Sequence, residues 1–170
     1  LKLITEHLYS VLSHIESGVL MRWLENLPHP QNSDDYLFPL INAWANFIAG
    51  KTKRSRMWLE KAYGMREKHE GSTAFRGTNK VFEAIEVGIL VFAGEYEKAL
   101  QLGRESLENL GGPQLFLRST IMHNMGEALE RIGRPEEAYE YFIRSQASAE
   151  KSGRRIISLL CSCEIGWIEY

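Results

Sequence analysis

Few residues of this chain have the types and spacing that chemistry requires. Glu127 and Glu130 form an i,i+3 carboxylate pair that could in principle serve acid–base work, but Arg131 and Arg134 nearby favour an ordinary ion-pair role. The sequence holds no G-x-S-x-G, H-E-x-x-H or C-x-x-C motif, and no cysteine with an evident histidine partner. We therefore expect a protein that is not an enzyme and needs no cofactor.

Two local patterns suggest metal or nucleotide binding, and each has a simpler interpretation. His7 and His14 lie two helical turns apart on one face, which suits a metal only if a carboxylate joins them. The "AGKT" at 49–52 is like a phosphate-binding loop, but the earlier glycine would fall at Ala45 and the approach is helical where a strand is needed. A solvated or capping role for the histidines and a plain turn at 49–52 are favoured.

Composition limits the function further. The 20 Lys and Arg nearly cancel the 22 Asp and Glu, so no overall field attracts nucleic acid; the run of Lys51, Lys53, Arg54 and Arg56 could touch phosphate or an acidic partner but is interpreted as a solvated face. Without a membrane-length apolar run or a visible signal peptide, the expected location is the cytoplasm. Cys161 and Cys163, two apart on a helix, point about 200° apart and are interpreted as core thiols.

The elements that position these residues are helices in a repeat. Gly50, Gly94 and Gly133 are each followed, five residues later, by a small residue (Ser55, Ala99 or Ala138), between two apolar helical runs. Glycine suits a turn, and a small residue lets the second helix pack closely on the first. Spacings of 44 and 39 residues between the glycines predict an all-α, tetratricopeptide-like superhelix, an α-solenoid.

The chain is predicted to be one solenoid fragment, 1–170, and an excerpt of a longer protein, since it opens and stops inside helices. The units are placed at 1–30, 34–70, 73–112 and 114–152, with a truncated unit at 154–170. Helices are expected near 2–14, 17–26, 34–49, 53–69, 73–93, 95–110, 114–132, 135–152 and 154–170.

The unit at 114–152 is the clearest. Gly126, Gly133, Ala138 and Phe142 fall on the tetratricopeptide pattern's glycine, turn glycine, small residue and aromatic, and Gly166 of the truncated unit lies forty residues after Gly126. The unit at 73–112 departs from the pattern, with Val87 and Gly103 in place of the usual glycine and aromatic. In the unit at 34–70, Ser55 replaces the usual alanine.

The order of these segments resembles the helical-repeat sensor region of the MalT-type, large ATP-dependent LuxR-family transcriptional regulators. Trp23, Leu24, Leu27 and Pro28 match that family's "RWLEALP"-like segment, and Trp44 with Gly50 matches its "AWALLLAG"-like segment. The resemblance implies an NTPase (ATP-binding) module before the repeats and a helix-turn-helix DNA-binding domain after them. It also implies that the repeats take up a small inducer and that the activator self-associates on DNA.

Repeat geometry predicts where a ligand would bind, because the first helix of each unit lines the concave surface. The groove positions in this register are Trp44, Phe47, Phe92, Thr120, His123, Glu127, Glu130, Arg131, Cys163, Trp167 and Tyr170. Aromatic faces combined with His and Glu suit a small polar molecule. The alternative for Trp44 and Phe92 is that they belong to the core between repeats.

Two functions remain open. The first is a small-molecule sensor and oligomerisation arm of a bacterial transcriptional activator, which contacts DNA only through another domain and no membrane. The alternative is a scaffold whose groove takes a partner's peptide. A carboxylate clamp for a peptide terminus would need several Lys and Arg, and this register supplies mainly Arg131, which favours the small molecule.

Overall fold

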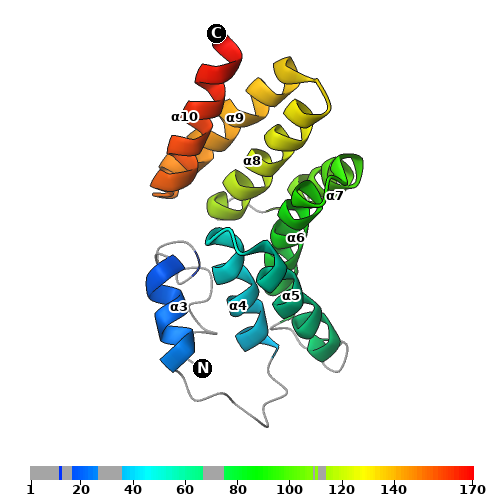
Figure 1. Cartoon of the computed structure of the whole chain (residues 1–170), viewed down its shortest axis with the longest axis vertical. Helices are drawn as coiled ribbons and strands as arrows, with labels where there is room; N and C mark the ends of the chain where they lie inside the picture. The colour runs from blue at the N-terminus through cyan, green and yellow to red at the C-terminus, as the bar shows by residue number, and fades with distance from the viewer. Residues whose placement is uncertain (1–11, 13–16, 27–35, 67–74, 109, 111–113) are drawn as a thin grey trace. The chain divides into compact units, whose positions relative to one another are not determined.

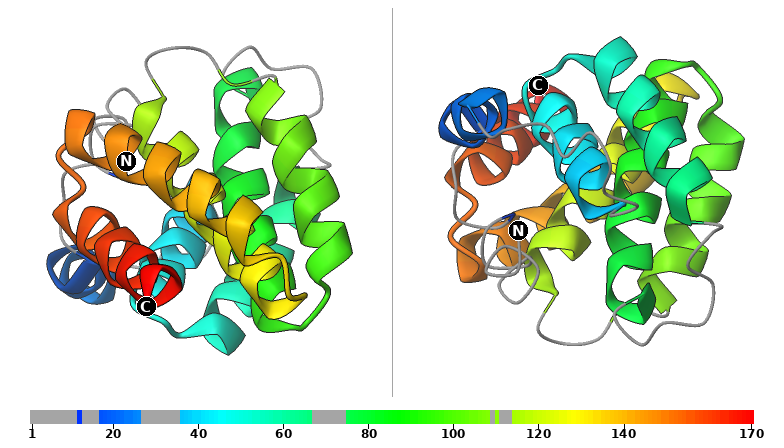
Figure 2. Two further views of the ribbon diagram at one scale, coloured as in Figure 1. Left: turned by 90° about the horizontal axis from the view of Figure 1, so that it is seen from above. Right: turned by 90° about the horizontal axis from the view of Figure 1, so that it is seen from below.

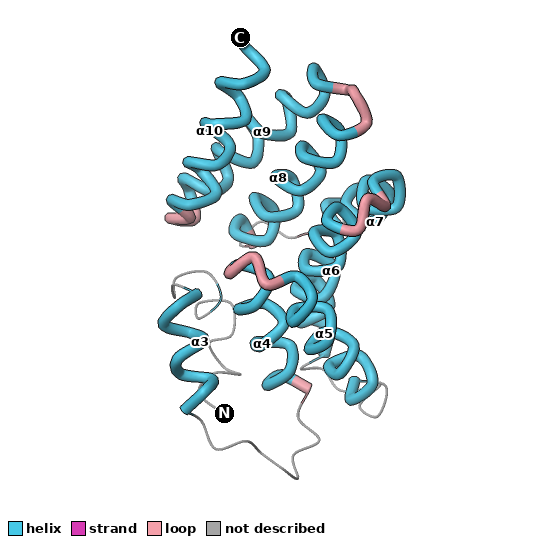
Figure 3. The backbone as a smooth tube through the Cα atoms, in the orientation of Figure 1, coloured by secondary structure: helices cyan, strands magenta, loops and turns pink. Residues whose placement is uncertain are grey.

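The computed structural model describes residues 12, 17–26, 36–66, 75–108, 110 and 114–170, and over these ranges the chain is helical with short turns and no strand (Figures 1 and 3). The predicted all-α class is confirmed for the described residues. The eight helices are α3 (Ser17–Asn26), α4 (Leu37–Ile48), α5 (Thr52–Arg66), α6 (Phe75–Phe92), α7 (Tyr96–Glu108), α8 (Leu115–Arg131), α9 (Pro135–Lys151) and α10 (Arg155–Glu169).

The predicted helix ranges agree with these bounds to within a few residues. The expected helix at 2–14 lies outside the described residues except for Leu12, as do His7 and His14. Leu27 and Pro28, two of the residues that carry the family resemblance, also lie outside them. None of the helices in the described ranges combines the length and apolar character needed to cross a membrane.

The chain divides into two compact units. Unit 1, 1–85, holds α3, α4, α5 and the first part of α6; unit 2, 86–170, holds the remainder of α6 and α7 to α10. Within unit 1, α4 packs against both α3 and α5, and within unit 2, α9 packs between α8 and α10 while α7 packs on α8 (Figure 2).

Four turns between helices share one backbone geometry. Gly50, Gly94, Gly133 and Gly153 all have positive φ, between 70° and 79°. At Gly133 the glycine N–H donates to the Glu130 carbonyl at 3.0 Å and the next N–H donates to Leu129 at 2.9 Å, and the other three turns repeat this pair. These are Schellman caps, which need a left-handed residue and so favour glycine. The first three were predicted from the sequence; Gly153 adds the turn into α10.

The core of unit 2 is built on close helix contacts. Phe142 of α9 is fully buried and lies so close to Gly126 of α8 that a Cβ on this glycine would be 2.5 Å from the ring. Gly103 of α7 accepts Met125 of α8 in the same way, with 2.5 Å between the added Cβ and Sδ. Gly103, which replaces the aromatic of the tetratricopeptide pattern in the repeat at 73–112, thus makes room for a methionine from the next helix.

Buried serines tie paired helices together. Ser145 Oγ on α9 donates to the Ser119 carbonyl on α8 at 2.8 Å, and in unit 1 Ser55 Oγ on α5 donates to the Ala43 carbonyl on α4 at 2.9 Å. Both serines are completely buried. Ser55, which departs from the usual alanine, therefore keeps the small size that the contact requires and adds a hydrogen bond.

Candidate functional site

The predicted groove residues fall into buried and exposed groups. Trp44, Thr120 and His123 are buried, Phe47 and Glu127 are partly buried, and the remaining six are exposed: Phe92, Glu130, Arg131, Cys163, Trp167 and Tyr170. Because Trp44 and Phe47 lie in unit 1 and the others in unit 2, each group is described within its own unit.

Trp44 is a core residue. Its side chain is fully buried, its Nε1–H donates to the Leu12 carbonyl at 3.3 Å, and its ring lies 6.2 Å from that of Phe47. Thr120 is also occupied, because its hydroxyl donates to the Phe116 carbonyl of the same helix at 2.9 Å. Neither residue lines an open groove in this structure, and the alternative of a core role holds for Trp44. Phe92, in contrast, is 61% exposed.

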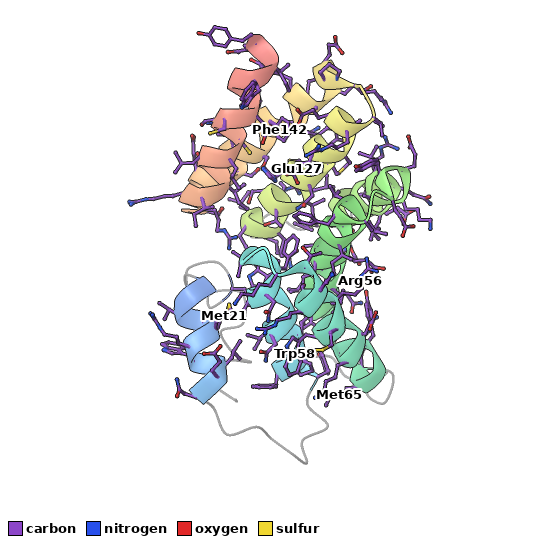
Figure 4. All side chains as sticks on the ribbon, viewed as in Figure 1. Met21, Arg56, Trp58, Met65, Glu127 and Phe142 are labelled. Carbon is purple, nitrogen blue, oxygen red and sulfur yellow. The ribbon has the colours of Figure 1, made fainter. Side chains whose placement is uncertain are left out.

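The polar residues that the structure does bring together are on α8 and α10. His123 and Glu127, one helical turn apart on α8, have Nδ1 and Oε2 3.8 Å apart, which is too long for a hydrogen bond. The His123 ring lies 5.8 Å from that of Phe142, and its Nε2 is buried with no hydrogen-bond partner. Figure 4 labels Glu127 and Phe142 in this part of unit 2. An unpaired polar atom in a core is costly, so this nitrogen marks an unsatisfied site.

Burial and like charges set the protonation of these groups. The pKa of Glu127 is raised to about 7, chiefly by burial and then by the neighbouring carboxylate of Glu164, while Arg131 opposes the shift and Glu130 adds to it. The pKa of Glu164 on α10 is also raised, first by burial and then by Glu130. Burial lowers the pKa of His123 to about 4. At neutral pH the histidine is therefore uncharged, so it forms no ion pair with Glu127.

We call His123, Glu127, Glu130, Arg131 and Glu164 the α8–α10 cluster. Its three carboxyl groups outnumber its one arginine, so a donor or cation placed among them would be stabilised. No group of three or more His, Cys, Asp or Glu side chains in the described ranges has the arrangement that a metal ion needs.

Next to the cluster, Cys161 Sγ lies 3.3 Å from Ser145 Oγ, and burial raises the pKa of this thiol, so it is a poor nucleophile. The interpretation of both cysteines as core thiols is correct for Cys161 and wrong for Cys163, which is exposed. Side chains two positions apart on one helix point in nearly opposite directions, so only one of the two can face the core.

Sequence reasoning missed Glu164. A signal was present: Glu164 is two residues before Gly166, as Asn124 is two before Gly126, and Asn124 is buried. The forty-residue register therefore places Glu164 on the face that packs against the preceding helices.

No known protein family, curated protein or solved structure matches this chain.

Proposed function

We propose that this chain is the helical-repeat sensor region of a MalT-like, LuxR-family transcriptional activator, which binds a small inducer and takes part in self-association. The recurring helix pairs support the proposal. The same glycine cap joins α4 to α5, α6 to α7, α8 to α9 and α9 to α10, as expected of a tetratricopeptide-like solenoid. DNA and ATP would be bound by other domains of the longer protein.

The α8–α10 cluster carries the ligand-binding half of the proposal. His123 is buried with an unsatisfied ring nitrogen, and Glu127 and Glu164, both partly buried, have raised pKa values. Such groups destabilise the folded chain and are found more often at functional sites than elsewhere. His123 and Glu127 also belong to the groove register that the repeat predicts.

The chemistry of the cluster points to the class of inducer. Carboxylates only accept hydrogen bonds when ionised, and uncharged His123 can accept one at whichever ring nitrogen lacks its proton. A small molecule with an amine or several hydroxyl groups supplies the matching donors, and an amine also offsets the excess negative charge.

A thermal melt against amines, sugars, organic acids, aromatic acids and nucleotides tests the proposal. A compound at about 100 times its dissociation constant stabilises by about 2.7 kcal/mol, which raises the melting temperature of a chain of this size by about 5–10 °C. We expect the shift from amines or polyols, and we expect Glu127→Gln to abolish it. Glu140→Gln, an exposed site on α9, is the matched control and should keep it.

The second candidate, a scaffold for a partner peptide, is favoured by Trp167, which is 79% exposed on α10. Exposed aromatic side chains of this kind anchor protein interfaces. A panel in which no compound raises the melting temperature would contradict the sensor proposal and favour this one.

A further inference from the structure

Helix α5 has an outer face on which basic and apolar side chains alternate. At 100° per residue, six of its side chains fall within an arc of about 140°. The three basic ones are exposed, the central methionine is 55% exposed, and the other two are partly buried. We call these six residues the α5 face: Lys53, Arg54, Met57, Trp58, Lys61 and Met65.

The other side of α5 is packed within unit 1. Ser55, Leu59 and Ala62 are buried, and α4 packs on α5 over much of its length. On the side of α6, the ring of Tyr63 lies 4.7 Å from that of Phe82. Both helices that adjoin α5 in the sequence are therefore in place against it, and the α5 face is the part that they leave exposed. Figure 4 labels two residues of this face, Trp58 and Met65.

Helix α5 is more basic than the corresponding helices of the other repeats. It carries five Lys or Arg against one Glu, whereas α7 carries two against three and α9 carries two against four. Counted from the turn glycines, Lys53 and Arg54 correspond to Glu136 and Glu137 of α9. The helix dipole favours carboxylates in a first turn and disfavours cations there. The stability of α5 therefore does not explain its charge.

The cations of the α5 face are not neutralised by the described part of the chain. Lys53, Arg54 and Lys61 form no ion pair with any described residue, and Glu60, the one acidic residue of α5, lies outside the arc. The N-terminal ends of α7 and α9 differ, because each has an internal ion pair: Lys98 with Glu95, and Arg134 with Glu137. A cluster of unpaired cations attracts an anionic partner.

We propose that the α5 face binds an acidic segment of another protein, in which Asp or Glu residues alternate with apolar side chains. Carboxylates of this segment pair with the three cations, and its apolar side chains pack on the methionines and the tryptophan between them. The α5 face shares no residue with the α8–α10 cluster or with the predicted groove. The proposal therefore does not rest on the sensor function.

The apolar residues determine the class of partner. Met57 lies between Lys53 and Lys61 in one row of positions four residues apart, where the phosphates of a nucleic acid would leave it without an apolar contact. A flexible methionine adapts to varied apolar side chains. Trp58 is held in place, with Lys61 Nζ 5.0 Å from its ring centroid and the Phe38 ring edge-on at 6.0 Å. A tryptophan fixed in this way suits an interface anchor.

The first test measures binding of a labelled peptide by fluorescence anisotropy at low ionic strength. The probe repeats Glu-Leu-Leu-Glu-Ala over about 15 residues, which as a helix spans about 22 Å and covers the face. We expect the whole chain to bind it, and Arg54→Glu to weaken binding about fivefold or more. Arg104→Glu, at an exposed site on α7, is the matched control with the same change of charge. Absence of binding, or equal weakening by both variants, would overturn the proposal.

The second test examines the apolar contacts. We expect Met57→Ser to weaken peptide binding about threefold or more, whereas Ile143→Ser, at a site 41% exposed on α9, should leave it unchanged. A peptide with serine in place of every leucine should bind more weakly at equal charge. Equal affinity for the two peptides, or displacement of the probe by duplex DNA or anionic phospholipid vesicles at lower charge concentration than by unlabelled peptide, would contradict a protein partner.

Stability measurements separate lost binding from lost folding. Arg54→Glu places a carboxylate in the first turn of α5, so it should raise the melting temperature by about 1–4 °C while it weakens binding. Lys61→Gln, beyond the first turn, is a second variant that should weaken binding without this rise. Both variants should keep any shift that amines or polyols cause, because the α8–α10 cluster is unchanged. A loss of peptide binding only in variants with a lower melting temperature would refute the proposal.

Discussion

The contact between Gly126 and Phe142 gives the sharpest test of the packing. An alanine Cβ at Gly126 would lie 2.5 Å from Cε1 of the ring and 2.8 Å from Cδ1 and Cζ, where about 3.5–4.0 Å is the normal separation. The fully buried ring cannot turn away, so one of the helices must shift. Overpacking of this kind costs about 1–3 kcal/mol, against a gain of about 1 kcal/mol from replacing a helical glycine.

We therefore expect Gly126→Ala to lower the free energy of unfolding by up to about 2 kcal/mol and the melting temperature by up to about 4–8 °C. Gly166→Ala, where nothing lies within 4 Å of the added Cβ, is the control and should stabilise by up to about 1 kcal/mol. Gly103→Ala should fall between them, because Met125 is flexible. Urea unfolding followed by circular dichroism measures all three. A stabilising Gly126→Ala would refute the close contact between α8 and α9.

Three further predictions follow from other contacts. The pKa of Glu127 in the folded chain is about 7, above the ordinary value of 4.5, so the free energy of unfolding falls as the pH rises from about 4.5 to about 7. In urea unfolding, Glu127→Gln should therefore be more stable than the natural chain by about 1–3 kcal/mol at pH 8, and this difference should vanish below about pH 4.5. Ser145→Ala should lose about 1–2 kcal/mol in the same assay because the Ser119 carbonyl loses its donor, whereas exposed Ser162→Ala should not. Gly133→Ala, at φ 77°, should cost about 1–2 kcal/mol in thermal melts, and Gly133→Asn less.

The turns of this fold could be predicted from sequence because their chemistry is local. A Schellman cap needs a left-handed residue, so glycines at 50, 94 and 133 mark helix ends whatever the rest of the chain does. The size requirement at Ser55 and Ala138 is also local to a helix pair. These local patterns do not determine how successive helix pairs are arranged, and that arrangement was predicted from the forty-residue spacing alone.

The surroundings of each side chain could not be predicted in the same way. Periodicity shows which residues share a helix face, but not which neighbour covers it. Trp44 was expected in a groove, whereas Leu12, far away in sequence, accepts its hydrogen bond in the core. Leu159, Cys163 and Trp167 of α10 have the spacing of a buried helix face, yet all three are exposed.

The most direct test of the sensor account is calorimetric titration of the chain with putrescine, agmatine and glucosamine at pH 7, in buffers of different ionisation enthalpy. A cation bound among the carboxylates lowers the pKa of Glu127, which is near 7 in the free chain. The account predicts that at least one amine binds with release of protons, and that Glu127→Gln removes this release. Absence of binding by every amine, or proton release that Glu127→Gln leaves unchanged, would contradict it.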